Sequence, residues 1–177
     1  MLRSISVSDS PRQTRVGLLV DYPVLLRALR GTDPDAVPRL PDIVGRARTL
    51  GSIFVARAYG AWYDVDEATT AFSAGLDPVF VPPAAAGSVP TTNALISDGM
   101  GLLEKHLVDV LAVSGDERLL PLMQSARETE VAVALIAHAC QPGGPCLGLA
   151  EVAEPAAAFA RTQTRAERYR RPSPSVA

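Results

Sequence analysis

Residues 108–118 read Val108-Asp109-Val110-Leu111-Ala112-Val113-Ser114-Gly115-Asp116-Glu117-Arg118. The apolar run predicts a strand that is buried on both faces, and the Ser-Gly-Asp turn places a carboxylate at the carboxyl end of that strand. Residues 16–21, Val16-Gly17-Leu18-Leu19-Val20-Asp21, repeat this arrangement, and a helical pattern follows each strand. Because ligands of open α/β sheets gather at the carboxyl ends of strands, two such carboxylates indicate a divalent metal site.

Strand-like and helix-like segments alternate around these two runs. Strands are expected at 15–20, 52–59, 79–81, 108–114 and 131–137, with an edge strand at 147–152. Helices are expected at 23–30, 40–50, 64–74, 91–106 and 119–126, the fourth capped by Thr91 or Thr92, and the Ala-rich segment 155–168 predicts another. This alternation predicts βαβ units, and therefore a three-layer α/β/α fold with a mainly parallel central sheet of about five strands.

The composition is that of a globular domain. The chain has 177 residues, of which 47% are hydrophobic and 20% charged, with a net charge of −2. We expect a flexible leader at 1–14, one domain at 15–160 and a disordered, Arg-rich tail with Pro and Ser at 161–177. The net charge predicts no global attraction to nucleic acid, so any such binding requires a local basic patch. No apolar run reaches the ~20 residues of a membrane span, and we expect a cytoplasmic protein.

The cysteines and histidines give weak signals. Cys140 and Cys146 flank Gln-Pro-Gly-Gly-Pro, a spacing that matches no zinc ribbon or redox motif. We expect unpaired loop thiols, with a loop-closing disulfide as the alternative. His106 and His138 stand apart in the sequence and are interpreted as surface or loop residues rather than catalysts.

Four segments, in order, carry a resemblance to a known family. They are Val20-Asp21-Tyr22-Pro23-Val24, Ala58-Tyr59-Gly60-Ala61-Trp62, the helix with Asp98-Gly99-Met100, and Val113-Ser114-Gly115-Asp116-Glu117-Arg118, which is followed by Pro121-Leu122. Over residues 15–137 the chain resembles the NYN family of PIN-like domains, of the LabA-like type. The resemblance implies a PIN-like sheet whose clustered acids hold Mg²⁺ or Mn²⁺ for hydrolysis of RNA phosphodiesters. Asp21, Asp98 and Asp116 would then be the metal ligands and catalytic residues.

Three departures from the family pattern fall in that site. Val24 stands where the family has Asn, Thr92 stands at the first acid of the central helix, and Arg118 replaces the second acid of the Ser-Gly-Asp turn. A cation inside a metal site repels the metal. Arg118 either points to solvent or folds over Asp116 and Asp98 as a salt bridge in place of the metal, and we favour the second. Glu117 is an alternative source of the lost carboxylate.

The resemblance and its departures lead to two main hypotheses. The first is a NYN-like protein with a partly lost metal site, non-catalytic or weakly active, that binds or regulates a partner. The alternative is a Mg²⁺- or Mn²⁺-dependent ribonuclease. Arg57, Tyr59 and Trp62 are candidates for a nucleic-acid path, with partial core as the other interpretation. Candidate partners are RNA, a protein bound through the surface or the Arg-rich tail, and a second copy of the chain; no membrane is expected.

Overall fold

The computed structural model describes residues 13–31, 34–84, 89–140 and 146–152, and of residues 137–140 and 146–152 it describes the backbone alone. Most of the predicted leader, the predicted helix at 155–168 and the predicted tail lie outside the described residues.

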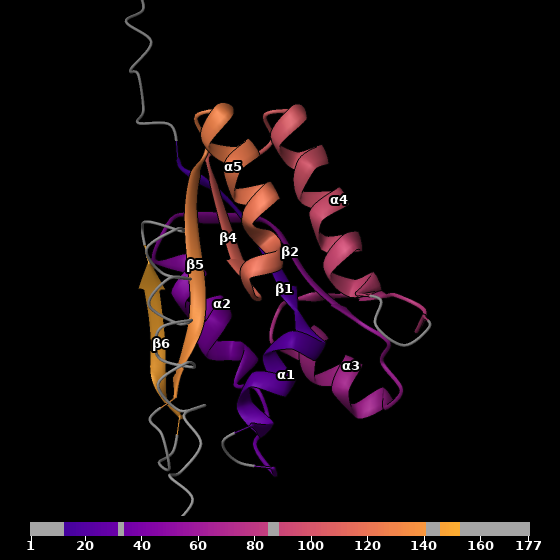
Figure 1. The fold of residues 1–177 in the computed structure, drawn as a ribbon. Helices are drawn as coiled ribbons and strands as arrows, with labels where there is room; N and C mark the ends of the chain where they lie inside the picture. Colours follow the sequence, from indigo (N-terminus) through magenta and orange to yellow (C-terminus); the bar gives the residue numbers. More distant parts are fainter. Residues whose placement is uncertain (1–12, 32–33, 85–88, 141–145, 153–177) are drawn as a thin grey trace, which may run out of the picture.

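The centre of the molecule is one sheet with all of its first five strands parallel (Figure 1). In spatial order these are β3 (Asp77–Phe80), β2 (Ser52–Gly60), β1 (Arg15–Asp21), β4 (Val110–Ser114) and β5 (Ala132–Cys140). A sixth strand, β6 (Cys146–Val152), pairs antiparallel with β5 at one edge. The predicted α/β fold with a mainly parallel sheet is confirmed.

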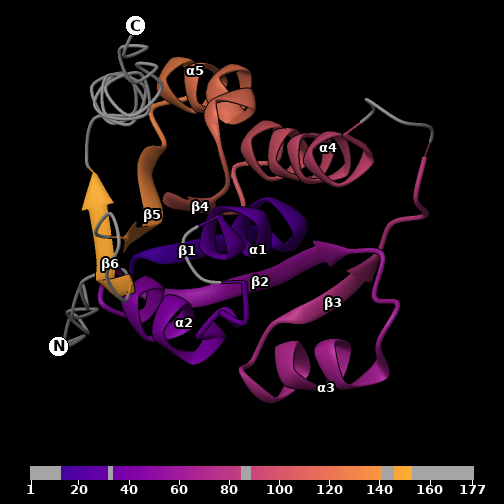
Figure 2. The ribbon, with the colours of Figure 1, turned by 60° about the horizontal axis from the view of Figure 1, so that its bottom comes forward.

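Helices cover both faces of this sheet (Figure 2). One face packs against α1 (Tyr22–Arg30), α2 (Leu40–Arg48) and α3 (Val65–Ser73), and the other against α4 (Pro90–Glu104) and α5 (Leu120–Glu128), which follows the short 3-10 helix η1 (Glu117–Leu119). Successive strand residues point to opposite faces, so Leu18 of β1 joins the first core and Leu19 the second. Two covered faces explain why the interiors of β1 and β4, residues 16–20 and 110–113, carry no polar side chain.

The fourth helix begins earlier than the sequence suggested, and neither Thr91 nor Thr92 caps it. Its N-cap is Val89, which makes no side-chain capping bond, and Pro90 opens the helix. Proline suits this position because its fixed φ is helical and the first N–H has no partner in the helix. Both threonines therefore lie in the first turn, where they are buried.

The two cysteines lie in strands rather than in a loop, which corrects the prediction. The fifth strand extends past residue 137 because it pairs with β6, and Cys140 and Cys146 are register partners in that pair. His138 also lies in β5. None of the described helices is long and apolar enough to cross a bilayer.

Candidate functional site

The candidate site lies where β1 and β4 end side by side. After β1 the chain builds β2 and β3 on one side of the sheet, and it then returns to build β4 and β5 on the other. Val20 and Ser114 are register partners, so Asp21 and the turn after Ser114 emerge at the same edge. Such a topological switch point leaves a crevice outside the carboxyl ends of the strands, where α/β proteins bind their ligands.

Asp21 ends β1 and caps α1. Its side chain is fully buried, Oδ1 accepts a hydrogen bond from the backbone N–H of Val24 (3.3 Å), and Oδ2 accepts one from the Thr92 hydroxyl (2.5 Å). Burial raises the pKa of the Asp21 carboxyl; the bonds from Thr92 and Val24 oppose this rise, and the charge of Asp116 adds to it. The carboxylate is thus held by the protein, and its neutral form is favoured relative to an exposed Asp.

Asp116 caps η1 and is held by Arg118. Its Oδ1 accepts a hydrogen bond from the backbone N–H of Arg118 (3.1 Å), and its Oδ2 lies 3.5 Å from Nη1 of the same arginine. A Cβ at Gly115 would lie 3.7 Å from the Cβ of Asp21 and 2.6 Å from Cδ1 of Leu119. The absence of a side chain at residue 115 leaves room for Leu119, while the turn packs in ordinary contact with the end of β1 and brings Asp116 close to Asp21.

Asp98 belongs to a different network. It lies on α4, and its Oδ2 accepts hydrogen bonds from Nη1 of Arg57 and from the hydroxyl of Tyr59, both at 2.7 Å. Burial raises the pKa of Tyr59, and Asp98 acts in the same direction, so the phenol stays protonated and donates. The cation that pairs with Asp98 is therefore Arg57 of β2, whereas Arg118 pairs with Asp116.

The aromatic residues expected on a nucleic-acid path, Tyr59 and Trp62, pack and form hydrogen bonds within the fold. Tyr59 is fully buried, and its ring has no face available to a base. The Trp62 ring packs against Tyr22 with their centroids 5.0 Å apart, and its Nε1 donates to the carbonyl of Val79 (2.9 Å). Arg57 is partly exposed but bonded to Asp98.

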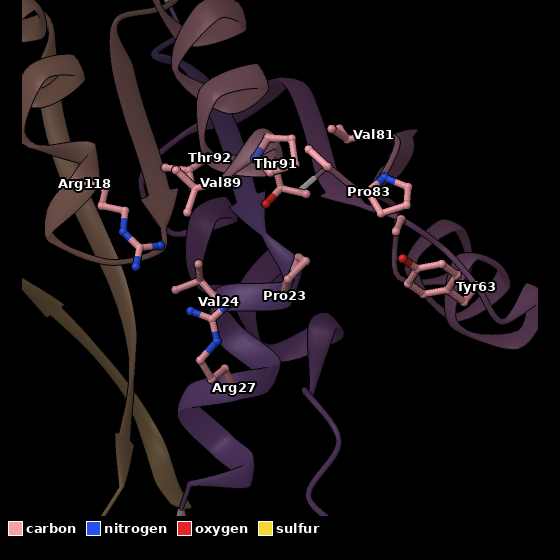
Figure 3. Close-up of a pocket in the computed structure, with 13 residues that line it drawn as sticks. Pro23, Val24, Arg27, Tyr63, Val81, Pro83, Val89, Thr91, Thr92 and Arg118 are labelled. Carbon is pink, nitrogen blue, oxygen red and sulfur yellow. The ribbon is translucent and has the colours of Figure 1, made fainter. Parts of the chain in front are cut away.

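A pocket of about 240 Å³ opens at this edge, between α1, α4 and η1 (Figure 3). Its lining includes Val24, Thr91 and Thr92, the ring of Tyr63 and two arginines, Arg27 and Arg118. Figure 3 shows both guanidinium groups extending toward the pocket, together with the hydroxyls of Thr91 and Tyr63. None of the described residues that line it is acidic.

Sequence reasoning missed three of these lining residues: Arg27, Thr91 as a site residue, and Tyr63. A signal for Arg27 was present, because it lies two helical turns beyond a strand-end Asp, on the helix that starts at the switch point. Tyr63 follows the strand-end turn after β2 and is 81% exposed. Exposed aromatic residues at such an edge are candidates for ligand contact.

The described acids do not form a ready metal cluster. Within the described residues, no three His, Cys, Asp or Glu side chains are grouped so that they could hold a metal ion. The structure brings Asp21 and Asp116 together and places Asp98 with Arg57 and Tyr59. Val24 offers an apolar side chain to the pocket.

Comparisons with known proteins support the fold alone. No family model matches the chain, and no curated protein matches its sequence. Among solved structures, the protein of unknown function VPA0982 from Vibrio parahaemolyticus has a TM-score of 0.60 and 15% identity, over 73% of this chain and 84% of that one. Two others match at TM-scores too low to carry an argument: glycinamide ribonucleotide transformylase 1 from Symbiobacterium toebii (0.38, 18% identity, 91% and 84% covered) and phosphoribosylglycinamide formyltransferase from Brucella melitensis (0.35, 15%, 89% and 91%). The chain therefore shares an α/β fold with VPA0982.

Proposed function

We propose that this chain is a NYN-like, PIN-like binding protein that holds RNA at the switch-point edge without metal-dependent hydrolysis. One observation carries the proposal: each of the three acids expected to bind metal is already bonded to a group of the protein. Asp21 accepts from Thr92, Asp116 pairs with Arg118, and Asp98 accepts from two side chains of β2. The parallel fold and the order of the quoted segments support the family, and these contacts favour its non-catalytic form.

The donor set does not fit Mg²⁺ or Mn²⁺. Mg²⁺ demands near-octahedral coordination by oxygen, usually with at least one or two ionised carboxylates directed at the ion. Asp21 is fully buried with its pKa raised, and the expected third ligand, Asp98, is bonded to Arg57 and Tyr59. The guanidinium of Arg118 lies beside Asp116 and adds a positive charge that repels a second cation.

The groups that remain are suited to binding an anion. Arginine presents several N–H donors in a planar fork and pairs well with phosphate oxygens. Arg27 and Arg118 supply such donors at the pocket, where none of the lining residues that the structure describes is acidic. Because Asp21, Asp98 and Asp116 are each bonded to a protein group, the proposed role of this edge is to bind and orient a phosphate-bearing chain and to leave its phosphodiesters intact.

The ribonuclease alternative has one observation in its favour. Asp21 and Asp116 lie close enough for the charge of Asp116 to raise the pKa of Asp21, so two acids of the family pattern still meet at the switch point. For these acids to hold a metal, Arg118 would have to leave Asp116, and Asp21 would have to ionise in a buried position.

Calorimetric titration of Mn²⁺ separates the two functions. Wild type and Asp116→Asn are both expected to show no site-specific heat at millimolar metal, and a fluorescent single-stranded oligoribonucleotide should bind equally with Mn²⁺ or with EDTA. Arg118→Asp removes the cation and adds a carboxylate, so this variant is the one expected to gain Mn²⁺ binding. Stoichiometric Mn²⁺ binding by wild type, lost in Asp116→Asn together with RNA cleavage, would establish the nuclease instead.

A further inference from the structure

We infer that the pocket between α1, α4 and η1 binds a terminal phosphate, a phosphomonoester dianion held by Arg27 and Arg118. The inference deepens the proposed function and rests on it for one of two sources of this chemistry, the phosphorylated end of an RNA strand. A free nucleoside monophosphate is the other source.

The first argument is the availability of the two guanidinium groups. Arg27 has no ion-pair partner within the described residues, and its side chain is exposed. Among the described residues, the guanidinium of Arg118 pairs only with Asp116, through Nη1 at 3.5 Å, and the side chain is 41% exposed. Charge-assisted N–H···O bonds are typically ~2.7–2.9 Å long. Arg57 reaches that distance on Asp98, at 2.7 Å, so Arg57 is committed and Arg118 is not.

The second argument is the arrangement of the nearby acids. Asp21 is fully buried and bonded to Thr92, and Asp116 is not among the lining residues. An incoming anion therefore meets the guanidinium of Arg118 before it meets either carboxylate. Elsewhere on the same helix the charge is reversed: a second pocket contains Arg30 but is lined by Asp64, Asp66 and Glu67.

The third argument is charge and size. A phosphomonoester carries about −1.5 to −2 charges at neutral pH and offers three terminal oxygens, which matches two guanidinium groups better than an internal phosphodiester with one charge. The volume of about 240 Å³ is below the roughly 300–1,000 Å³ of pockets for drug-sized ligands. It suits an end group rather than a continuous strand. The exposed ring of Tyr63 at the same pocket offers a surface on which the attached base can stack.

The experiment compares ends that differ by one phosphate. A short fluorescent oligoadenylate is prepared with a 5′-phosphate, with a 3′-phosphate, or with hydroxyls at both ends, and fluorescence anisotropy gives the Kd of each probe in EDTA. Calorimetry with adenosine monophosphate and with adenosine tests binding of the free nucleotide. A phosphorylated probe should bind more tightly than its hydroxyl form. Arg27→Gln and Arg118→Gln should each raise the Kd of the phosphorylated probe by roughly tenfold or more, as expected for loss of a hydrogen bond to a charged group.

Two variants sharpen the result. Arg30→Gln makes the same charge change on the same helix but outside the pocket, so its Kd for the phosphorylated probe should stay within about a factor of two of wild type. Thermal melts check that every variant is folded. Asp116→Asn releases Arg118 and should tighten binding of the phosphorylated probe, whereas loss of a metal ligand would weaken it. Equal Kd for phosphorylated and hydroxyl ends, or equal losses in Arg27→Gln and Arg30→Gln, would overturn the terminal-phosphate site.

The outcomes also separate the two proposals. RNA that binds in EDTA with no preference for a phosphorylated end keeps the proposed function and removes the terminal-phosphate site. Adenosine monophosphate that binds through Arg27 and Arg118, with no RNA binding, supports the site and removes the RNA function.

Discussion

The hydrogen bond between Thr92 and Asp21 should be one of the more costly single contacts to remove. The Thr92 side chain is 1% exposed and Asp21 is 0% exposed, and the hydroxyl lies 2.5 Å from Oδ2. In Thr92→Val the volume is nearly kept but the donor is lost, and no water can reach the carboxylate in its place. Hydrogen bonds to charged groups contribute roughly 1.5–3 kcal/mol. We expect the free energy of unfolding to fall by about 2 kcal/mol, which lowers Tm by roughly 4–8 °C in a domain of this size.

Urea unfolding followed by circular dichroism measures this change, and a double-mutant cycle with Asp21→Asn isolates the pair. The matched control is Thr129→Val, because the Thr129 hydroxyl donates to neutral backbone carbonyls of Ser125 and Ala126 at 3.1 Å. Thr129→Val should lower the free energy of unfolding by about 1 kcal/mol. The reasoning fails if Thr92→Val lowers the free energy of unfolding by no more than Thr129→Val. It also fails if the effects of Thr92→Val and Asp21→Asn on this free energy are additive, because the carboxylate then does not depend on this donor.

Two further predictions concern the other held groups. Burial raises the pKa of Asp21 in the folded state above its value in the unfolded chain. The protonated form of Asp21 therefore contributes stability that is fully present below the unfolded-state pKa. This stability is lost as pH rises through the folded-state pKa. The difference in unfolding free energy between Asp21→Asn and wild type should therefore grow as pH rises from about 4 toward 7, and parallel curves would refute this. Tyr59→Phe removes one of the two donors to Asp98 and should cost about 1–2 kcal/mol in urea unfolding, while the affinity for phosphorylated RNA stays unchanged; a large loss of affinity would place Tyr59 in the binding site.

The fold could be predicted because its strongest signals are local. β1 and β4 are continuous apolar runs that each end in an acid or an acid-bearing turn, and helical patterns follow both. Each run needs two covered faces, which a doubly covered parallel sheet provides. The start of α4 was missed because Thr is a frequent cap and was weighted above Pro90, which opens the helix and leaves Thr92 for Asp21.

The candidate site could be located from the sequence but its contacts could not. The pairing of Asp21 with Asp116 follows from parallel strands that end together at Val20 and Ser114. The partner of Asp98 depends on the register of α4 over β2, which places Arg57 and Tyr59 beneath it, and no local pattern encodes that register. The pocket is formed by segments distant in sequence, around residues 23–27, 61–63, 81–84, 89–92 and 118, so the role of Arg27 is visible only in the folded chain.

Under the proposed function, the turn after β4 makes residue 118 decisive for the ligand that this edge accepts. Gly115 leaves room for the Leu119 side chain where the turn packs against the end of β1, and Asp116 caps η1 by accepting from the backbone N–H of Arg118. That capping bond fixes the backbone of residue 118, and its side chain lies both beside Asp116 and in the wall of the pocket. An acid at this position would add its charge to those of Asp116 and Asp21 and favour a cation. An arginine neutralises Asp116 and extends its remaining donors into the pocket, where Arg27 adds a second positive charge. Under the proposed function, the same backbone therefore favours a metal ion or a phosphate according to the sign of the charge at one position, and in this chain that charge is positive.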